Sequence, residues 1–118
     1  MALRKKLAYE IDSRDMYFIL RCIRDAAMGG VEDMRAAAMQ DIADGGDEWR
    51  VIIDMYERTT GYLLKLHGRM ARQWKRHSGA ERRGQIDEYI KNCDLIRDCM
   101  KEYVGQIEKA ARERAGCG

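Results

Sequence analysis

The sequence predicts an all-α protein, an elongated helical bundle in which a long antiparallel helical hairpin is packed by shorter N-terminal helices. Three observations carry this prediction. None of the 118 residues is proline, apolar residues recur at helical spacing along most of the chain, and glycine pairs separate the periodic stretches. The alternating pattern of a half-buried strand is missing. The length suits a single helical domain over residues 1–118.

Helices are expected over residues 3–28, 31–43, 48–77 and 80–113, followed by a frayed tail at 114–118. Whether residues 3–28 form one helix or two stays open. Gly29 and Gly30 are expected to end the first element, and Gly45 and Gly46 follow the second, where glycine suits a left-handed C-terminal cap. Asp47 is then expected to start the third.

The two long segments carry heptad patterns, which favour helix pairing. The first repeats Trp49, Tyr56, Leu63, Met70 and His77, with Ile52, Thr59, Leu66 and Gln73 interleaved and Ile53, Thr60, His67 and Trp74 beside them. The second repeats Ile86, Cys93, Met100 and Ile107, with Tyr89, Ile96, Tyr103 and Ala110 between. Ser78 and Glu81 fit a capping box, which predicts a tight turn between the two helices.

The predicted length of the last helix bears on assembly. A helix over 80–113 would be about 50 Å long, whereas a compact globule of this size has a radius of gyration of about 13 Å. The molecule should therefore be elongated. Short N-terminal helices would leave part of the apolar seam uncovered, near Trp74, Tyr89, Met100 and Tyr103. A homo-oligomer or an obligate protein partner is the expected solution.

Residues for catalysis or metal binding are scarce. His67 and His77 are the only histidines, and they lie about 15 Å apart along one predicted helix, too far to share a metal. Cys93 and Cys99 are about 9 Å apart along another, beyond disulfide reach. Reduced cysteines are expected, three of the four in or near the core and Cys117 on the tail. No nucleophile–base pattern or phosphate-binding glycine loop is recognisable, so we expect no enzyme, no cofactor and no metal.

The formal net charge of +2 conceals a segregation of charge along the chain. Residues 12–50 hold nine acids and five bases, a net of −4, whereas residues 69–83 hold six bases and one acid, a net of +5. The middle of the chain is therefore the region in which an acidic partner surface or a phosphate backbone would bind. The candidate binding residues are Arg58, Lys65, Arg69, Arg72, Trp74, Lys75, Arg76, Arg82 and Arg83.

Five of these basic residues share one face of the predicted third helix, because they follow spacings of seven, four, three and four. They are Arg58, Lys65, Arg69, Arg72 and Arg76. Gly61 and Gly68 fall beside this stripe, where each costs about 1 kcal/mol relative to alanine. Close approach of a partner helix or a phosphate backbone would account for that cost; drift at an exposed site is the alternative.

Two functions are compatible with these features. The first is a non-enzymatic helical protein-binding module, an adaptor, inhibitor or assembly subunit that binds another protein or itself through its apolar seam and basic stripe. The alternative is a nucleic-acid-binding accessory protein that uses the stripe and Trp74. The near balance of 22 basic and 20 acidic residues favours a protein partner. Apolar runs are too short to span a membrane, and the N-terminal residues lack a secretory signal pattern, so a cytoplasmic location is expected.

Overall fold

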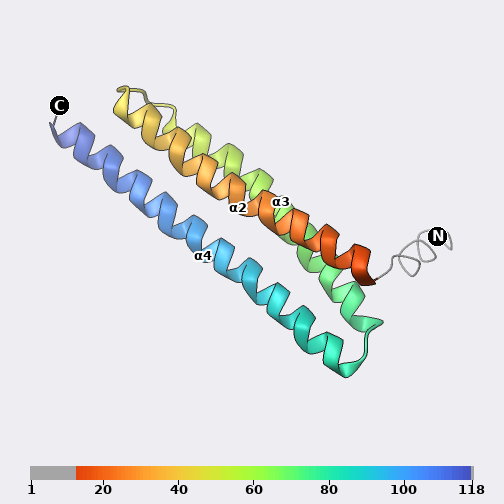
Figure 1. Cartoon of the computed structure of the whole chain (residues 1–118). Helices are drawn as coiled ribbons and strands as arrows, with labels where there is room; N and C mark the ends of the chain where they lie inside the picture. Colours follow the sequence, from red (N-terminus) through yellow and green to blue (C-terminus); the bar gives the residue numbers. More distant parts are fainter. Residues whose placement is uncertain (1–12, 118) are drawn as a thin grey trace.

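The computed structural model describes residues 13–117 and consists of three long helices, α2 (Ser13–Ala43), α3 (Trp49–Arg76) and α4 (Ala80–Cys117). They form an elongated all-α bundle with extents of 59 × 28 × 18 Å and a radius of gyration of 18.2 Å, as predicted. Consecutive helices run in opposite directions, so that the start of α2 and the α3–α4 turn lie at the same end (Figure 1). Residues 3–12 of the first predicted helix lie outside the described part.

One prediction that the structure overturns concerns the first glycine pair. Helix α2 runs without interruption through Gly29 and Gly30, where the sequence predicted one helix ending and a second beginning. Neither glycine has a positive φ; the described glycine that does is Gly45, at 79°. Gly30 instead serves packing, because a Cβ there would lie 2.8 Å from the Thr60 hydroxyl oxygen on α3. Gly30 therefore allows close helix contact, and the pair does not end the helix.

The connection between α2 and α3 is organised by Asp41. Its Oδ2 accepts a hydrogen bond from the Glu48 backbone amide at 2.9 Å, and Gly45 makes the left-handed turn that ends α2, as predicted. Helix α3 begins at Trp49. Its N-cap residue is Glu48, whose side chain makes no capping hydrogen bond. The expected role of Asp47 at the helix start is thus taken by a carboxylate of the preceding helix.

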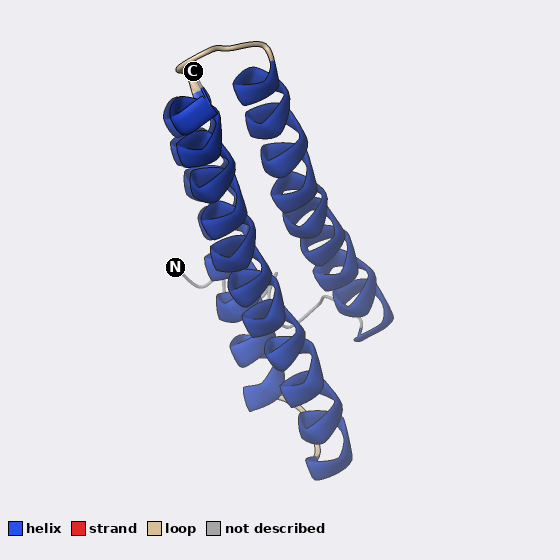
Figure 2. Cartoon of the chain, turned by 90° about the vertical axis from the view of Figure 1, so that its left-hand side faces the viewer, coloured by secondary structure: helices blue, strands red, loops and turns tan. Residues whose placement is uncertain are grey.

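The turn between α3 and α4 is short, as predicted, but its serine acts differently. The Ser78 hydroxyl donates to the Trp74 carbonyl oxygen at 2.7 Å and thereby satisfies the end of α3. Helix α4 then begins at Ala80 and continues to Cys117. The predicted fraying from residue 114 is therefore wrong for residues 114–117, which extend the last helix by a turn. Figure 2, coloured by secondary structure, shows the helices joined by short loops.

The core is a continuous column of three apolar clusters, each built by all three helices. Near the α3–α4 turn it contains Met16, Leu20, Ala71, Trp74 and Ile86. The middle contains Ala27, Val31, Leu64, Cys93 and Ile96, and the opposite end contains Met34, Ala38, Ile42, Ile53 and Ile107. Because α2 runs the length of the bundle, it covers more of the apolar seam than expected: Trp74 is 8% exposed, and Met100, Tyr89 and Tyr103 are half-buried.

The buried face of α3 is rotated from the predicted one. The residues expected to widen the seam are its centre, since Ile53, Thr60, His67 and Trp74 are buried together with Leu64 and Ala71. Tyr56, Leu63 and Met70, expected at the centre, are half-buried at the margin. On α4 the heptad residues Ile86, Cys93 and Ile107 are buried, as predicted. Cys22 is exposed on α2 and does not join the core. Within the described residues, no helix has the length and apolar character needed to cross a membrane.

Candidate functional site

The face of α3 that points away from the core carries a straight row of exposed side chains. Their spacing alternates between four and three residues, the spacing that keeps a row on one side of a helix over many turns. We call this row the outer stripe; it consists of Val51, Met55, Arg58, Tyr62, Lys65, Arg69, Arg72 and Arg76. All eight residues are exposed. The stripe changes in character along its length, from apolar at the start of α3 to basic at its end.

The first half of the outer stripe exposes large apolar side chains. Val51 is 60% exposed, Met55 59% and Tyr62 61%, and all three lie within about three helical turns. Isolated exposed apolar residues are ordinary, but several aligned on one face mark a contact surface. These three residues were not among the predicted binding residues, although the sequence places them on the same 4–3 spacing as the predicted basic stripe.

The second half of the outer stripe confirms the shared face that the sequence predicted for the basic residues. Lys65, Arg69, Arg72 and Arg76 project into solvent, and none of them makes an ion pair within the described residues. Arg58 differs, because its guanidinium lies 3.1 Å from Asp54 one turn earlier on the helix. Four uncompensated cations in a row attract an acidic surface, and the attraction weakens as salt rises.

The other predicted binding residues hold the α3–α4 turn together. Trp74 is buried, with its ring stacked on Tyr89 at a centroid separation of 6.3 Å, and the Arg82 guanidinium lies 5.7 Å from the indole. Lys75 forms a 2.6 Å ion pair with Asp87 across the two helices. These side chains join the end of α3 to α4, so Trp74 offers no open ring on which a base could stack.

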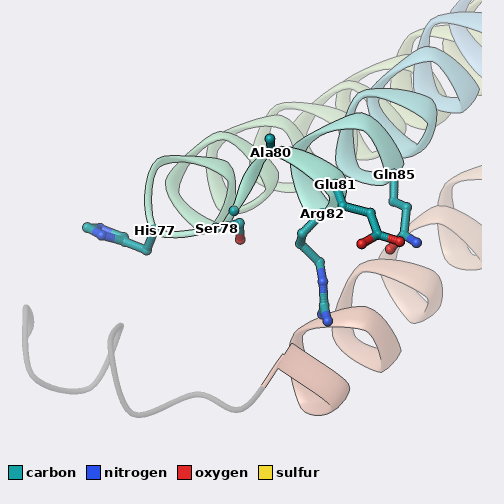
Figure 3. Close-up of a pocket in the computed structure, with 7 residues that line it drawn as sticks. His77, Ser78, Ala80, Glu81, Arg82 and Gln85 are labelled. Carbon is teal, nitrogen blue, oxygen red and sulfur yellow. The ribbon is translucent and has the colours of Figure 1, made fainter.

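The turn itself borders an open hollow of about 510 Å³. Figure 3 shows Glu81, Arg82 and Gln85 extending from the first turns of α4, while His77 projects away from them. Arg83 is exposed and donates from Nε to the Ser78 carbonyl oxygen at 2.9 Å. The hollow is wide and lined mostly by polar groups, which is unlike the concave apolar sites that hold small molecules.

The two glycines predicted for close approach occupy different surroundings. Gly61 lines an open groove of about 330 Å³ between α3 and α4, whose other walls include Leu64, Met100 and Val104. A Cβ at Gly61 would meet nothing within 4 Å, so no contact inside the chain requires glycine. Gly68 lies beneath Arg72, and a Cβ there would meet that guanidinium at an ordinary 3.6 Å. Neither position is explained by packing within this chain.

The buried polar residues of α3 face α2 and α4. His67 is 1% exposed, and its Nδ1 has no hydrogen-bond partner. Burial lowers the pKa of His67, and the charges of Arg24 and Arg97 lower it further. Burial likewise raises the pKa of the Cys93 thiol. A neutral imidazole and an uncharged thiol suit a core, and among residues 13–117 no group of three or more metal-ligating side chains comes together. Asp94, on the exposed side of α4, pairs with Arg97 at 2.8 Å.

No protein-family model, curated protein or solved structure matches this chain. The function is therefore inferred from the chemistry of the surface. Packing among the described residues does not explain the side chains of the outer stripe.

Proposed function

We propose that this chain is a non-enzymatic helical protein-binding module, an adaptor, inhibitor or assembly subunit, and that it binds its partner through the outer stripe of α3. The observation that supports the proposal most directly is the alignment of three large exposed apolar side chains with four unpaired cations on one helix face. The apolar half supplies the area whose removal from water drives association, and the basic half supplies orientation and a faster encounter with an acidic partner.

The spacing of the outer stripe favours a helical partner. A row that alternates four and three residues faces one direction along about 38 Å of α3, from Val51 to Arg76. A second helix lying along that row contacts every member, as in a helix-in-groove or coiled-coil contact. The buried face of α3 already contacts α2 and α4, so the stripe is the side of this helix left for another protein.

Nucleic-acid binding remains the second candidate function, because Lys65, Arg69, Arg72 and Arg76 are unpaired on one face. Phosphate contacts by four cations would give binding that falls steeply with salt. The burial of Trp74 removes the aromatic platform on which this alternative partly relied, and Val51 and Met55 have no counterpart in a phosphate backbone. The protein partner is therefore the better supported of the two.

The test compares three tagged versions of the full chain, purified from the host under native conditions. In the stripe variant, Val51, Met55 and Tyr62 are all replaced by serine; in the control, Leu95, which is 65% exposed on α4, is replaced by serine. We expect one protein in near-stoichiometric amount with the wild type and the control, and its loss from the stripe variant. An untagged second copy of this chain is included, so that self-association is detected. Equal recovery by all three versions would overturn the proposal.

A filter-binding assay at two salt concentrations addresses the second candidate. The variants replace Arg69, Arg72 and Arg76 by glutamate, one at a time and together. The outer stripe would be a nucleic-acid-binding surface if the wild type retains RNA or DNA, if the retention falls with salt, and if the triple variant loses it. We expect no retention by the wild type above that of the triple variant.

A further inference from the structure

We propose that the partner of the outer stripe is a second copy of this chain, and that the exposed face of its α2 lies along α3 in the same N-to-C direction. This inference rests on the proposed function, since it names the occupant of the same surface. It follows from a match between two surfaces that the fold leaves exposed on different helices. Five positions of the α2 row take part in the match, whereas the sixth, Ala36, falls opposite Arg69.

The exposed face of α2 repeats the spacing of the outer stripe. Six residues follow intervals of four, three, four, three and four: Phe18, Cys22, Asp25, Gly29, Glu32 and Ala36. Five of them are exposed and Gly29 is half-buried. Phe18 is 48% exposed, one of the larger apolar exposures of the described chain. Like the outer stripe, this row begins with apolar residues and becomes charged further along, but its charge is negative.

A shift of 33 positions brings the two rows into register, because Phe18 then faces Val51 and Glu32 faces Lys65. At this shift the apolar starts of both rows coincide, with Cys22 opposite Met55. The carboxylates of Asp25 and Glu32 fall opposite the cations of Arg58 and Lys65. The reverse direction would place the acids of α2 against the apolar half of the stripe and Phe18 against arginines. Charge and apolarity therefore both select the parallel arrangement.

The match extends to side-chain size at Gly29, which falls opposite Tyr62. A Cβ at Gly29 would meet nothing within 4 Å among residues 13–117, so packing between these residues does not require glycine there. Tyr62 is 61% exposed and needs room in any helix that lies on it. A glycine at that position lets the two helix backbones approach while the tyrosine ring lies between them.

The two facing charge pairs differ in how they can form. Glu32 and Lys65 make no ion pair within the described residues and are available to each other. The second facing pair is Asp25 with Arg58. Asp25 already lies 3.3 Å from Arg24, and Arg58 lies 3.1 Å from Asp54, so each must bind its new partner beside the one it has. Such exposed pairs fix register more than they add affinity. The association is accordingly weak and sensitive to salt.

The contact has a consequence for the size of the assembly. Helices α2 and α3 run in opposite directions within one chain (Figure 1), so a parallel contact between chains requires the second copy to lie reversed. Each copy has one outer stripe and one α2 row to offer. The contact either closes, since two copies related by a two-fold axis can make it twice, or it propagates to further copies, and in both cases the mass rises above that of one chain.

Two charge variants of the full chain test the register, Lys65→Glu and Glu32→Lys. Each alone sets like charges opposite each other, and we expect its apparent dissociation constant to rise at least about tenfold. An equimolar mixture restores opposite charges at both kinds of contact, so it should associate like the wild type. Light scattering over a range of concentrations, after nuclease treatment, measures the average mass against 13.7 kDa for one chain. Failure of the mixture to associate more strongly than either variant would overturn the inference.

Glycine variants test the close approach independently of charge. Gly29→Gln is expected to abolish the growth in mass, whereas Gly61→Gln is the matched control, since a Cβ at Gly61 also meets nothing within 4 Å but lies in the α3–α4 groove. Circular dichroism checks that both variants keep the wild-type helix content. Equal association of the two variants would contradict the proposed Gly29–Tyr62 contact.

The outcomes separate this inference from the function on which it rests. If the wild-type chain stays at 13.7 kDa at every concentration, while the stripe variant still loses a host protein, the second-copy inference fails and the protein-binding function stands. If the chain stays monomeric and no host protein depends on the stripe, both fail. If nuclease treatment removes the association, a bridging nucleic acid replaces the second copy.

Discussion

The two faces of α3 show how differently one helix can be used. The inner face carries Ile53, Thr60, Leu64, His67, Ala71 and Trp74, all buried, and its residues are explained by contacts with α2 and α4. The outer face carries the outer stripe, whose residues all stay exposed to solvent in the described part of the chain. Folding explains the apolar residues of the buried face but not the exposed Val51, Met55 and Tyr62, and the outer stripe is therefore the surface that we propose for binding. The predictions below test how sharply the two faces differ.

The largest difference is expected from truncating one residue on each face. Leu64 is 1% exposed, so Leu64→Ala should lower the free energy of unfolding by about 2–5 kcal/mol. Tyr62→Ala, on the outer stripe, should change the stability of the isolated monomer by less than about 0.5 kcal/mol. Urea denaturation followed by circular dichroism measures both. A comparable loss in the two variants would mean that the outer stripe packs within the chain.

Adjacent glycines of α2 should respond in opposite directions. In Gly30→Ala the new Cβ would lie 2.8 Å from the Thr60 hydroxyl oxygen, so a loss of about 1–3 kcal/mol is expected. Gly29→Ala meets nothing within 4 Å and should stabilise the helix by about 0.4–1 kcal/mol. Thermal denaturation of both variants at low protein concentration is the measurement. If both stabilise, α2 and α3 do not approach closely at Gly30.

The buried histidine of the inner face predicts a pH dependence. Burial, then Arg24 and Arg97, lower the pKa of His67 in the folded chain below its usual 6.5, so the unfolded chain binds a proton that the folded chain refuses. His67 therefore lowers the free energy of unfolding as the pH falls from about 6.5 to the pKa of the folded chain. Above about pH 6.5 it adds no pH dependence. Unfolding of wild type and His67→Gln at pH 7.5, 6 and 5 isolates this component. Parallel pH profiles of stability for the two chains would show that His67 makes no such contribution.

The smallest effect is expected at the edge between the two faces. Lys75 and Asp87 form a 2.6 Å ion pair, with 38% of the Lys75 side chain and 47% of the Asp87 side chain exposed to solvent. Because water and salt screen such pairs, Lys75→Met should cost no more than about 1 kcal/mol. A double-mutant cycle with Asp87→Asn measures the coupling. A coupling well above that value would assign the pair a central role in closing the α3–α4 turn.

The sequence was informative about the fold where physical signals were local and repeated. The absence of proline and the heptad spacing predicted the long helices, the tight turn and the elongated shape. Gly29 and Gly30 misled, because a glycine pair looks alike whether it ends a helix or lets Thr60 approach. The position of the α3 seam was off because neighbouring rows are both apolar, and only the placement of α2 decides which is central. The serine at the turn was assigned to the wrong helix, since its hydroxyl can satisfy either end.

The outer stripe was recognised only in its basic half. Spacing alone aligns Arg58, Lys65, Arg69, Arg72 and Arg76, but it does not show that Val51, Met55 and Tyr62 are exposed. Their exposure depends on which side of α3 meets the rest of the bundle, and that information is not local. Trp74 was placed with the surface for the same reason, and the structure shows it buried against Tyr89.

Oxidative footprinting of the chain as it occurs in its host tests the central claim, that the outer stripe is a protein-binding surface, most directly. Met55 and Tyr62, 59% and 61% exposed, react readily with hydroxyl radicals, and the 65% exposed Leu95 on α4 is the internal control. The account predicts that Met55 and Tyr62 are protected in natively purified material, that dilution to the dissociated chain removes the protection, and that Leu95 reacts equally in both. Equal oxidation of Met55 and Tyr62 in the two samples would contradict it.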